Sequence, residues 1–558
     1  MTADDENRRV AIVGGLVFDG TGTGGDVRDI YLTGDTITDV TPHGAIRGTP
    51  AIIDATGLAV TPGFIDVHSH ADCAPLFREH DTSKILQGVT TEVVGNCGFS
   101  LAPRHDDTAA ALAAYVGRVF PSVPWAWRTT AELLACIDDA GSVTNYVPLV
   151  GHGSIRIAVM GMDRREPSSA ELAQMTSLLR QALDAGCFGL SSGLIYPPGM
   201  YATSQELLAL ASALPADRIY ASHIRGEGDD VSQSVMEAIA VSESAGRRVQ
   251  VSHLKVAGRG NWGRSAELLR LLDTARARGV DISQDAYPYT AASTMLAALL
   301  PPGMLDADDA EVLRRLADPA AVSTLAAAFT DGVPGWQNQV ADCGWEGILV
   351  SATADHRYEG YTIAGLAGEM GTDPIRALVR VLLDERLQAS MITFSMNESD
   401  VRAILASSST MIGSDGLPPG MGGRPHPRLY GTFPRFLGKH IREEKLMPLA
   451  EAVRRMTHLP ATTFGIPGRG LIAAGHIADI VAFEIETVGH DGDYLNPFCP
   501  PAGISWVMQS GRTVVRESQF CGVRRGRRLL PRPREGGTDP ANGPAEDPLK
   551  HAEGMSKS

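Results

Sequence analysis

Two histidines, His68 and His70, stand one residue apart directly after the apolar run 64–67. This run is entered through Pro62-Gly63 and predicts a short buried β-strand. Because the side chains of a strand alternate between its two faces, both imidazoles are expected to project to the same side. Such a pair at the end of a strand can hold one metal ion, although the same spacing often arises by chance.

The same layout, an apolar run that ends in a metal-binding type of side chain, recurs later in the chain. The later candidates are Cys97 after the run 91–94, His223 after 219–222, His253 after 249–252 and Asp415 at the end of 410–414. Taken singly, each has an ordinary alternative: a hydrogen-bonded core histidine, a buried thiol or an Asp-Gly turn. Six such residues at the ends of five predicted strands are poorly explained by chance. Together they predict a metal site, and the nitrogen, sulfur and oxygen donors favour Zn²⁺.

Apolar strands that alternate with amphipathic helical stretches predict how these residues are positioned. The eight candidate strands are 64–67, 91–94, 146–150, 189–192, 219–222, 249–252, 280–284 and 410–414. Helical stretches such as 168–185, 231–246 and 265–279 lie between them, which indicates parallel strands joined by crossover helices. Eight such strands form a closed (β/α)8 TIM-like barrel with its active site at their carboxyl ends. We therefore expect an α/β barrel that brings the six candidates to one rim.

Strand patterns at both chain ends predict a second, smaller domain. We assign residues 1–60 and 468–525 to one β-sandwich domain, since each half then covers the other's edges. The barrel is expected over 61–467, with an inserted helical lid or subdomain at about 290–409. Residues 526–558 are rich in Arg, Pro, Gly and Glu, and this composition predicts a disordered tail.

Composition limits the classes of function. The chain has 558 residues, 44% of them hydrophobic, so it can bury a full core. Its formal charge of -16 argues against a nucleic-acid partner. The acidic N-terminus does not resemble a secretory signal, and no apolar run reaches the roughly 18 to 20 residues that span a bilayer. We expect a cytoplasmic protein without a membrane partner, and the seven scattered cysteines do not suggest a disulfide framework.

Several short motifs resemble the amidohydrolase superfamily and, more narrowly, the N-acyl-D-amino-acid deacylases (D-aminoacylases). They are His68-Ser-His70, Gly95-Asn-Cys97-Gly, Ser222-His223, Ser252-His253-Leu-Lys255 and Ser414-Asp415-Gly416, and the resemblance runs from about residue 8 to 525. It implies zinc-dependent hydrolysis of the acyl amide of an N-acyl-D-amino acid to a carboxylate and a free D-amino acid. The small-molecule substrate is then an anion.

The resemblance also implies how the ligands are shared. Many amidohydrolases bridge two metals with a carbamylated lysine from strand four, but the stretch 189–193, Gly-Leu-Ser-Ser-Gly, offers none. Cys97 is implied to replace it and to hold the tightly bound zinc with His223 and His253. The remaining candidates, His68, His70 and Asp415, are implied to form a second, more weakly occupied position.

Zinc makes hydroxide available near neutral pH by lowering the pKa of its bound water to about 7. Asp415 is our candidate for the base that takes the water proton and returns it to the leaving amine. For the substrate carboxylate, the resemblance implies a clamp made by Lys255 and by Arg424, which lies in the Gly/Pro loop after Asp415. It implies that the same pocket is lined by Tyr196, Tyr287 and Ser293. Tyr287 could donate to the oxyanion or could be a packing residue.

Two other functions stay open on the sequence. One is another amidohydrolase activity, on a cyclic amide, a dipeptide or a carbamoyl compound, which the missing strand-four lysine disfavours. The other is a zinc-stabilised binding protein without catalysis, which has little support while Asp415 and the candidate ligands are all present.

Overall fold

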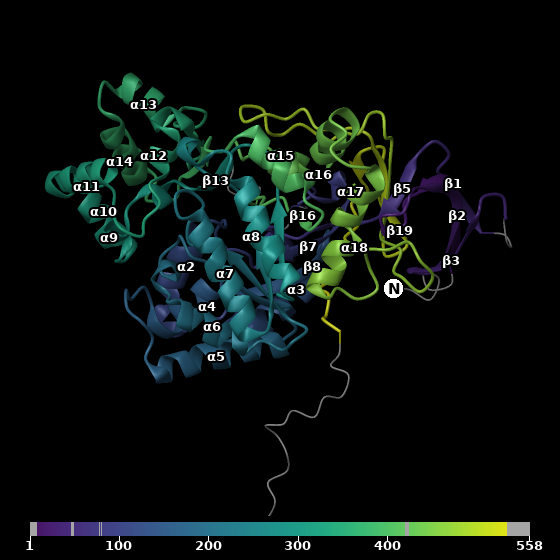
Figure 1. Ribbon diagram of the computed structural model, residues 1–558, viewed down its shortest axis with the longest axis horizontal. Helices are drawn as coiled ribbons and strands as arrows, with labels where there is room; N and C mark the ends of the chain where they lie inside the picture. The colour runs from purple at the N-terminus through teal and green to yellow at the C-terminus, as the bar shows by residue number, and fades with distance from the viewer. Residues whose placement is uncertain (1–7, 46–49, 78, 80, 419–422, 533–558) are drawn as a thin grey trace, which may run out of the picture.

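The structure is a computed structural model that describes residues 8–45, 50–77, 79, 81–418 and 423–532. A curved β-sheet stands at one end, a barrel surrounded by helices lies in the middle, and a mainly helical subdomain projects at the other end (Figure 1). Within these described ranges, no helix combines the length and the apolar character needed to cross a membrane.

The barrel consists of eight parallel strands that lie side by side in chain order, which confirms the predicted fold class. Their bounds are β6 Phe64–Asp66, β7 Val89–Val94, β8 Asn145–Gly151, β9 Gly189–Gly193, β10 Ile219–His223, β11 Arg248–Val251, β12 Ile282–Ala286 and β16 Thr410–Ile412. The first and last strands meet just beyond their ends, where Asp415 N donates to His68 O (2.7 Å) and His70 N donates to Gly416 O (3.1 Å). The seam of the barrel therefore carries three of the candidate ligands.

Amphipathic helices cover the outside of the barrel. They are α2 Ala109–Gly117, α3 Thr130–Ala140, α4 His152–Met160, α5 Ser169–Asp184, α6 Ser204–Ser212, α7 Val231–Ala245, α8 Ser265–Ala277, α15 Glu398–Ala406, α16 Arg428–Arg435, a π-helical continuation Phe436–Glu443, α17 Leu449–Met456 and α18 His458–Phe464. In α5, the Ser168 side chain accepts from Glu171 N while the Glu171 carboxylate accepts from Ser168 N, a capping box that fixes the start of the helix. Met175, Leu179 and Leu183 then recur at helical spacing and are buried.

The insertion after β12 folds around its own hydrophobic core, which includes Leu316, Ile348, Leu378 and Met391. Its helices are α9 Pro302–Leu305, α10 Asp309–Ala317, α11 Pro319–Asp331, α12 Gln339–Cys343, α13 Ile363–Met370 and α14 Pro374–Asp384. It also contains an antiparallel three-stranded sheet, which the sequence did not predict. This sheet has the order β13 (Ala292–Met295), β15 (Ser390–Thr393), β14 (Ile348–Ala352).

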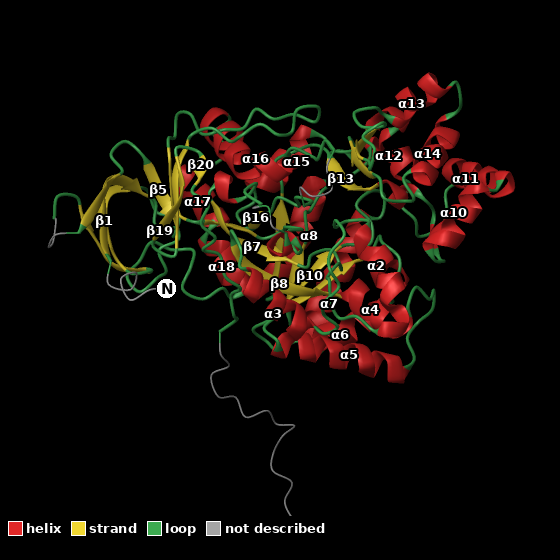
Figure 2. Ribbon diagram, turned by 180° about the vertical axis from the view of Figure 1, so that it is seen from behind, coloured by secondary structure: helices red, strands yellow, loops and turns green. Residues whose placement is uncertain are grey.

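The two chain ends share one nine-stranded sheet, seen edge-on beside the barrel in Figure 2. Its strands are β1 Arg9–Val17, β2 Asp26–Thr33, β3 Thr36–Pro42, β4 Ala51–Asp54, β5 Ala59–Pro62, β17 Ile480–Phe483, β18 Ile504–Gln509, β19 Arg512–Arg516 and β20 Gln519–Phe520. Antiparallel pairing of β5 with β17 joins the N-terminal and C-terminal halves. Ile12 and Ile30 from the first half share a core with Ile480 and Met508 from the second. We propose that the boundaries between this β domain and the barrel lie at residues 60 and 468.

The predicted disordered tail begins too early, because residues 526–532 pack against the base of the barrel. Arg527 O accepts from Tyr146 N (3.0 Å), and Leu529 N donates to Tyr146 O (2.8 Å). Leu529 is buried in the interior cluster with Phe188 and Phe464. Composition could not reveal this segment, because it is attached by backbone bonds, by one buried leucine and by ion pairs of Arg527 with Asp35 and of Arg528 with Asp138. The rest of the predicted tail, 533–558, lies outside the described residues.

We expect Leu529→Ala to lower the free energy of unfolding of the barrel by about 2 to 4 kcal/mol, because it empties a buried site. The matched control is Leu530→Ala, since the neighbouring leucine is 57% exposed, and its effect should stay within about 0.5 kcal/mol. Urea unfolding followed by tryptophan fluorescence measures both. Equal midpoints for the two variants would contradict the packing of the segment.

Candidate metal centre

All six predicted ligands lie at the carboxyl end of the barrel. His68 and His70 follow β6, Cys97 follows β7, His223 ends β10, His253 follows β11 and Asp415 follows β16. Parallel strands in a barrel end at a common rim, so residues separated by hundreds of positions in sequence converge there. The structure thus brings the predicted set together, while the role of each residue as a ligand stays a prediction.

Four donors of this set form a compact cluster. One atom each from His68, Cys97, His253 and Asp415 can be chosen so that all lie within 4.8 Å of one another. Cys97 Sγ is 3.2 Å from His68 Nε2 and 3.5 Å from His253 Nε2. A tetrahedral ion with bonds of about 2.0 to 2.3 Å separates its ligand atoms by about 3.3 to 3.8 Å. The cluster therefore has the dimensions of a single metal site.

The other two histidines border this cluster. His70 Nε2 lies 3.2 Å from Asp415 Oδ1. His223 is buried against His253, with the ring centroids 4.4 Å apart, and neither of its ring nitrogens has a hydrogen-bond partner among the described residues. A buried imidazole without partners is costly unless a ligand takes one nitrogen. This orphaned ring and the sulfur, nitrogen and oxygen donors beside it fit a bound metal ion.

Three of the donors stand on strained backbone. Cys97, His253 and Asp415 have positive φ angles of 55°, 35° and 50°, in a region that residues other than glycine seldom adopt. Close packing constrains the backbone just before Cys97, since a Cβ on Gly95 would lie 2.2 Å from the carbonyl oxygen of Leu149. Strain of this kind persists where surrounding contacts impose it, and it is concentrated at functional sites.

The charges around the cluster favour the ionised, metal-binding forms of its thiol and its carboxyl group. Burial alone would raise the pKa of Cys97, but the neighbouring charges of His68 and His253 hold it well below its usual range. Likewise burial opposes ionisation of Asp415, yet Arg428 and the nearby histidines keep its pKa well below the ordinary value. A thiolate and a carboxylate, the species that bind metal ions, are therefore both stabilised here.

Lys84, a buried lysine below the rim, links the elements that meet at the seam. The sequence analysis gave no reason to single it out. Lys84 Nζ donates to Asp66 Oδ2 (2.8 Å), Ser69 Oγ (3.1 Å) and Ser414 Oγ (2.8 Å), and it lies 3.3 Å from Glu92 Oε2. These partners come from β6, β7 and the loops next to the ligands. Nothing near Lys84 in the sequence reveals this role, because every partner but Glu92 is 15 or more positions away.

Glu227 is a second residue that the sequence analysis missed. Its carboxylate lies 3.2 Å from His253 Nδ1 and accepts from Lys255 Nζ (2.5 Å). A carboxylate at Nδ1 of a metal-binding histidine fixes the tautomer and leaves Nε2 facing the ion. Here His253 Nε2 faces Cys97.

The predicted substrate residues are brought together with one exception. Lys255, Tyr196 and Ser293 line a single pocket above the cluster. Tyr287 lies next to it, with its ring 5.8 Å from Lys255 Nζ and its buried hydroxyl without a partner among the described residues. Arg424 is exposed instead, and its backbone N–H donates to Ser351 O of β14 (2.6 Å).

Arg428 occupies the position that the sequence analysis expected of Arg424. It is 1% exposed, its Nη1 lies 2.9 Å from Asp415 Oδ2, and its Nη2 donates to Ser293 O (3.0 Å). Its guanidinium also lies 4.7 Å from the centre of the Tyr287 ring. Both arginines follow Asp415 in the same Gly/Pro-rich segment, and sequence alone did not indicate how that loop runs.

Comparison with known proteins agrees with this geometry. A family model described as "Amidohydrolase family" matches residues 51–498. The chain is 35% identical to a D-aminoacylase of Alcaligenes xylosoxydans xylosoxydans over 94% of this chain and 98% of that one. It is 33% identical to an N-acyl-D-aspartate deacylase of the same organism, over 93% and 94% of the two chains.

One solved structure is also similar to this chain in fold and in sequence. The N-acyl-D-glutamate deacylase of Bordetella bronchiseptica, complexed with zinc and a phosphonate mimic of the tetrahedral intermediate, superposes with a TM-score of 0.78. That protein is 34% identical in sequence, and the match covers 94% of this chain and 100% of the other.

We expect Cys97→Ala to lose both the bound metal and any activity that depends on it, because the thiolate is a central donor of the cluster. Cys187→Ala is the matched control, since Cys187 is also a buried free cysteine but burial raises its pKa to about 12. Metal content by plasma emission after dialysis checks both variants. Full retention of metal by Cys97→Ala would exclude this residue as a ligand.

Proposed function

The chain belongs to the amidohydrolase family and, within it, to the N-acyl-D-amino-acid deacylases, and we propose that it releases free D-amino acids from their N-acyl derivatives by zinc-dependent hydrolysis. The observation that carries this proposal is the compact donor cluster of His68, Cys97, His253 and Asp415 beside a pocket lined by Lys255. The donor cluster provides a site for a metal ion and a general base, and the pocket provides a site for an anionic substrate.

Zinc would be held by Cys97, His223 and His253 together with His68, His70 and Asp415. A thiolate with imidazoles and a carboxylate suits this ion. When bound, zinc lowers the pKa of its water to about 7 and polarises the carbonyl of the amide. The four-donor cluster includes members of both predicted positions, so the division of the six residues between a tight and a weak position stays a prediction.

Asp415 is the proposed general base. Its carboxylate is kept ionised by Arg428, to which Oδ2 is paired, while Oδ1 faces the histidines. An ionised carboxylate can take a proton from the attacking water and then deliver it to the departing amine nitrogen. Such proton transfer typically contributes about 10²- to 10⁴-fold to the rate.

The substrate α-carboxylate is proposed to bind between Arg428 and Lys255, with Tyr287 beside both. Arg428 replaces Arg424 in this role, because its guanidinium is buried at the pocket and the side chain of Arg424 is exposed. The unpartnered Tyr287 hydroxyl is available to donate to the carboxylate or to the oxyanion of the intermediate.

The fourth strand argues against the two-metal amidohydrolases that use a carbamylated lysine. In β9 the candidate positions are Ser191 and Ser192, both buried. The Ser191 hydroxyl donates to Gly95 O, and Ser192 Oγ lies 2.7 Å from the Tyr220 hydroxyl. This strand therefore supports the deacylase branch over the cyclic-amide, dipeptide and carbamoyl alternatives.

The direct test is the zinc-loaded full chain with N-acetyl-D-methionine and N-acetyl-L-methionine. We expect release of free methionine from the D-enantiomer, loss of this activity after chelation and its return with zinc. The free D-amino acid is measured by coupling to a D-amino-acid oxidase. Stoichiometric zinc without amine release from either enantiomer would instead support a non-catalytic zinc protein.

The two arginines give a second test. We expect Arg428→Met to lower kcat/KM by about 30- to 1000-fold, because a buried charge pair is broken and the substrate carboxylate loses its partner. Arg424→Met is the control and should change kcat/KM by less than about 2-fold, since its side chain is exposed. Circular dichroism establishes that both variants are folded. A large decrease in kcat/KM in Arg424→Met alone would indicate that Arg424, and not Arg428, binds the substrate carboxylate.

A further inference from the structure

The reaction pocket contains few positive charges, and each is already paired. Among the described residues that line it, Lys255 is the one lysine or arginine, and Glu227 accepts a hydrogen bond from it. Arg428, which donates to the backbone oxygen of the lining residue Ser293, is paired with Asp415. The pocket therefore offers two cations, matched by two carboxylates, before any substrate binds.

We propose that this pocket selects N-acyl-D-amino acids with uncharged or cationic side chains and rejects those with the side chain of aspartate or glutamate. The inference rests on the proposed function and specifies its substrate class. Sequence identity does not make this choice, because relatives named D-aminoacylase, N-acyl-D-aspartate deacylase and N-acyl-D-glutamate deacylase are 33% to 35% identical to this chain.

The first argument is the number of charges. The substrate α-carboxylate uses Arg428 and Lys255, the two available cations. A second carboxylate on the side chain would share the pocket with Glu227, Asp342 and Asp415, and Lys255, the one lysine or arginine among the described lining residues, is already bonded to Glu227. Burying an ionised carboxylate without a partner is strongly unfavourable.

The second argument is the wall that the subdomain contributes. Gln337 and Asp342, from the subdomain, line the pocket, and Gln337 Nε2 donates to Asp342 Oδ2 (2.7 Å). The carbonyl oxygen of the same glutamine accepts from Glu227 N (2.9 Å). Burial raises the pKa of Asp342 to about 6, so it is mostly ionised at neutral pH. This wall presents the negative charge of Asp342 together with the uncharged amides of Gln337 and Gln339.

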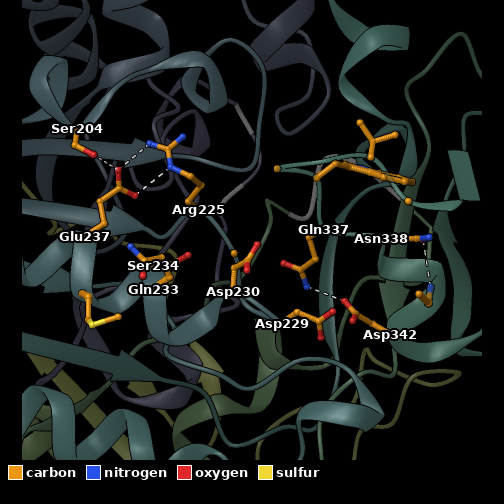
Figure 3. A pocket seen from close by; sticks show the side chains of 18 of the residues that line it. Ser204, Arg225, Asp229, Asp230, Gln233, Ser234, Glu237, Gln337, Asn338 and Asp342 are labelled. Atoms are coloured by element: carbon orange, nitrogen blue, oxygen red, sulfur yellow. Dashed lines mark hydrogen bonds and ion pairs between the residues drawn. The ribbon is translucent and has the colours of Figure 1, made fainter.

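The third argument is the space beyond that wall. A larger cavity of about 1000 Å³ shares Gln337 and Asp342 with the reaction pocket. Figure 3 shows Asp229, Asp230 and Glu237 around it, with Arg225 tied to Glu237 by bonds of 3.1 and 3.0 Å. A side chain that extends outward would thus meet further carboxylates and a guanidinium that is already engaged.

The neutral isosteres of the acidic substrates isolate the effect of charge. On the zinc-loaded full chain at pH 7.5, kcat/KM is measured for N-acetyl-D-glutamine against N-acetyl-D-glutamate and for N-acetyl-D-asparagine against N-acetyl-D-aspartate, by the free amine released. We expect each acid to be about 100-fold or more poorer than its amide. Asp342→Asn should narrow the glutamine-to-glutamate ratio by about 5-fold or more. Gln233→Ala, which alters the outer cavity without changing its charge, should leave that ratio within about 2-fold of the unaltered chain.

The outcomes separate the inference from the proposed function. Comparable hydrolysis of amides and acids overturns the selectivity and leaves the deacylase function standing. Absence of amine release from N-acetyl-D-methionine as well as from all four substrates overturns the deacylase function itself, whereas hydrolysis of N-acetyl-D-methionine without hydrolysis of either amide overturns the selectivity alone. An unchanged ratio in Asp342→Asn overturns the role of the subdomain wall, and should that variant not fold, the four substrates on the unaltered chain decide the selectivity.

Discussion

The seam between β6 and β16 is the constraint on which the site depends. Backbone hydrogen bonds from Asp415 to His68 and from His70 to Gly416 fix three donors against one another. Beneath them, the ammonium group of Lys84 bonds to Asp66, Ser69 and Ser414. Burying a lysine costs desolvation, but its carboxylate and hydroxyl partners offset this cost. Two of the four donors in the cluster, His68 and Asp415, are therefore fixed against each other by the backbone of the seam.

Charge pairing organises the pocket above the seam. Asp415 is paired with Arg428, and Glu227 is paired with Lys255 while its carboxylate also faces His253. Each anion thus connects the proposed metal centre to a cation that we propose binds the substrate. A substrate carboxylate that binds to these cations is held next to the donors that act on its amide, so binding and positioning use the same groups.

Much of the fold and the donor set could be predicted because the signals are local. Each strand is a short apolar run, and each candidate ligand comes at or directly after one, so barrel geometry alone places His68, Cys97 and Asp415 on one rim. The choice between Arg424 and Arg428 was not predictable, because it depends on the path of a Gly/Pro-rich loop. Long-range partners leave no local pattern either, which is why Lys84 escaped notice.

Two other parts of the fold were not predicted, because they also depend on contacts between residues far apart in sequence. The sheet formed by β13, β14 and β15 joins short strands about 40 to 100 positions apart in sequence, and such pairings have weak local signatures. The segment 526–532 has a polar composition, and it is attached by backbone bonds to Tyr146, by one buried leucine and by ion pairs of its arginines with Asp35 and Asp138. In both places tertiary contacts override what composition suggests.

The pairing of the two chain ends has a consequence for biosynthesis. β5 can pair with β17 only after more than 400 further residues have been made, and Leu529 reaches the barrel base later still. Until then, the N-terminal strands present an unpaired edge as the chain leaves the ribosome. Completion of this sheet is thus a late event in synthesis, and the nascent N-terminal strands are exposed to aggregation until it occurs.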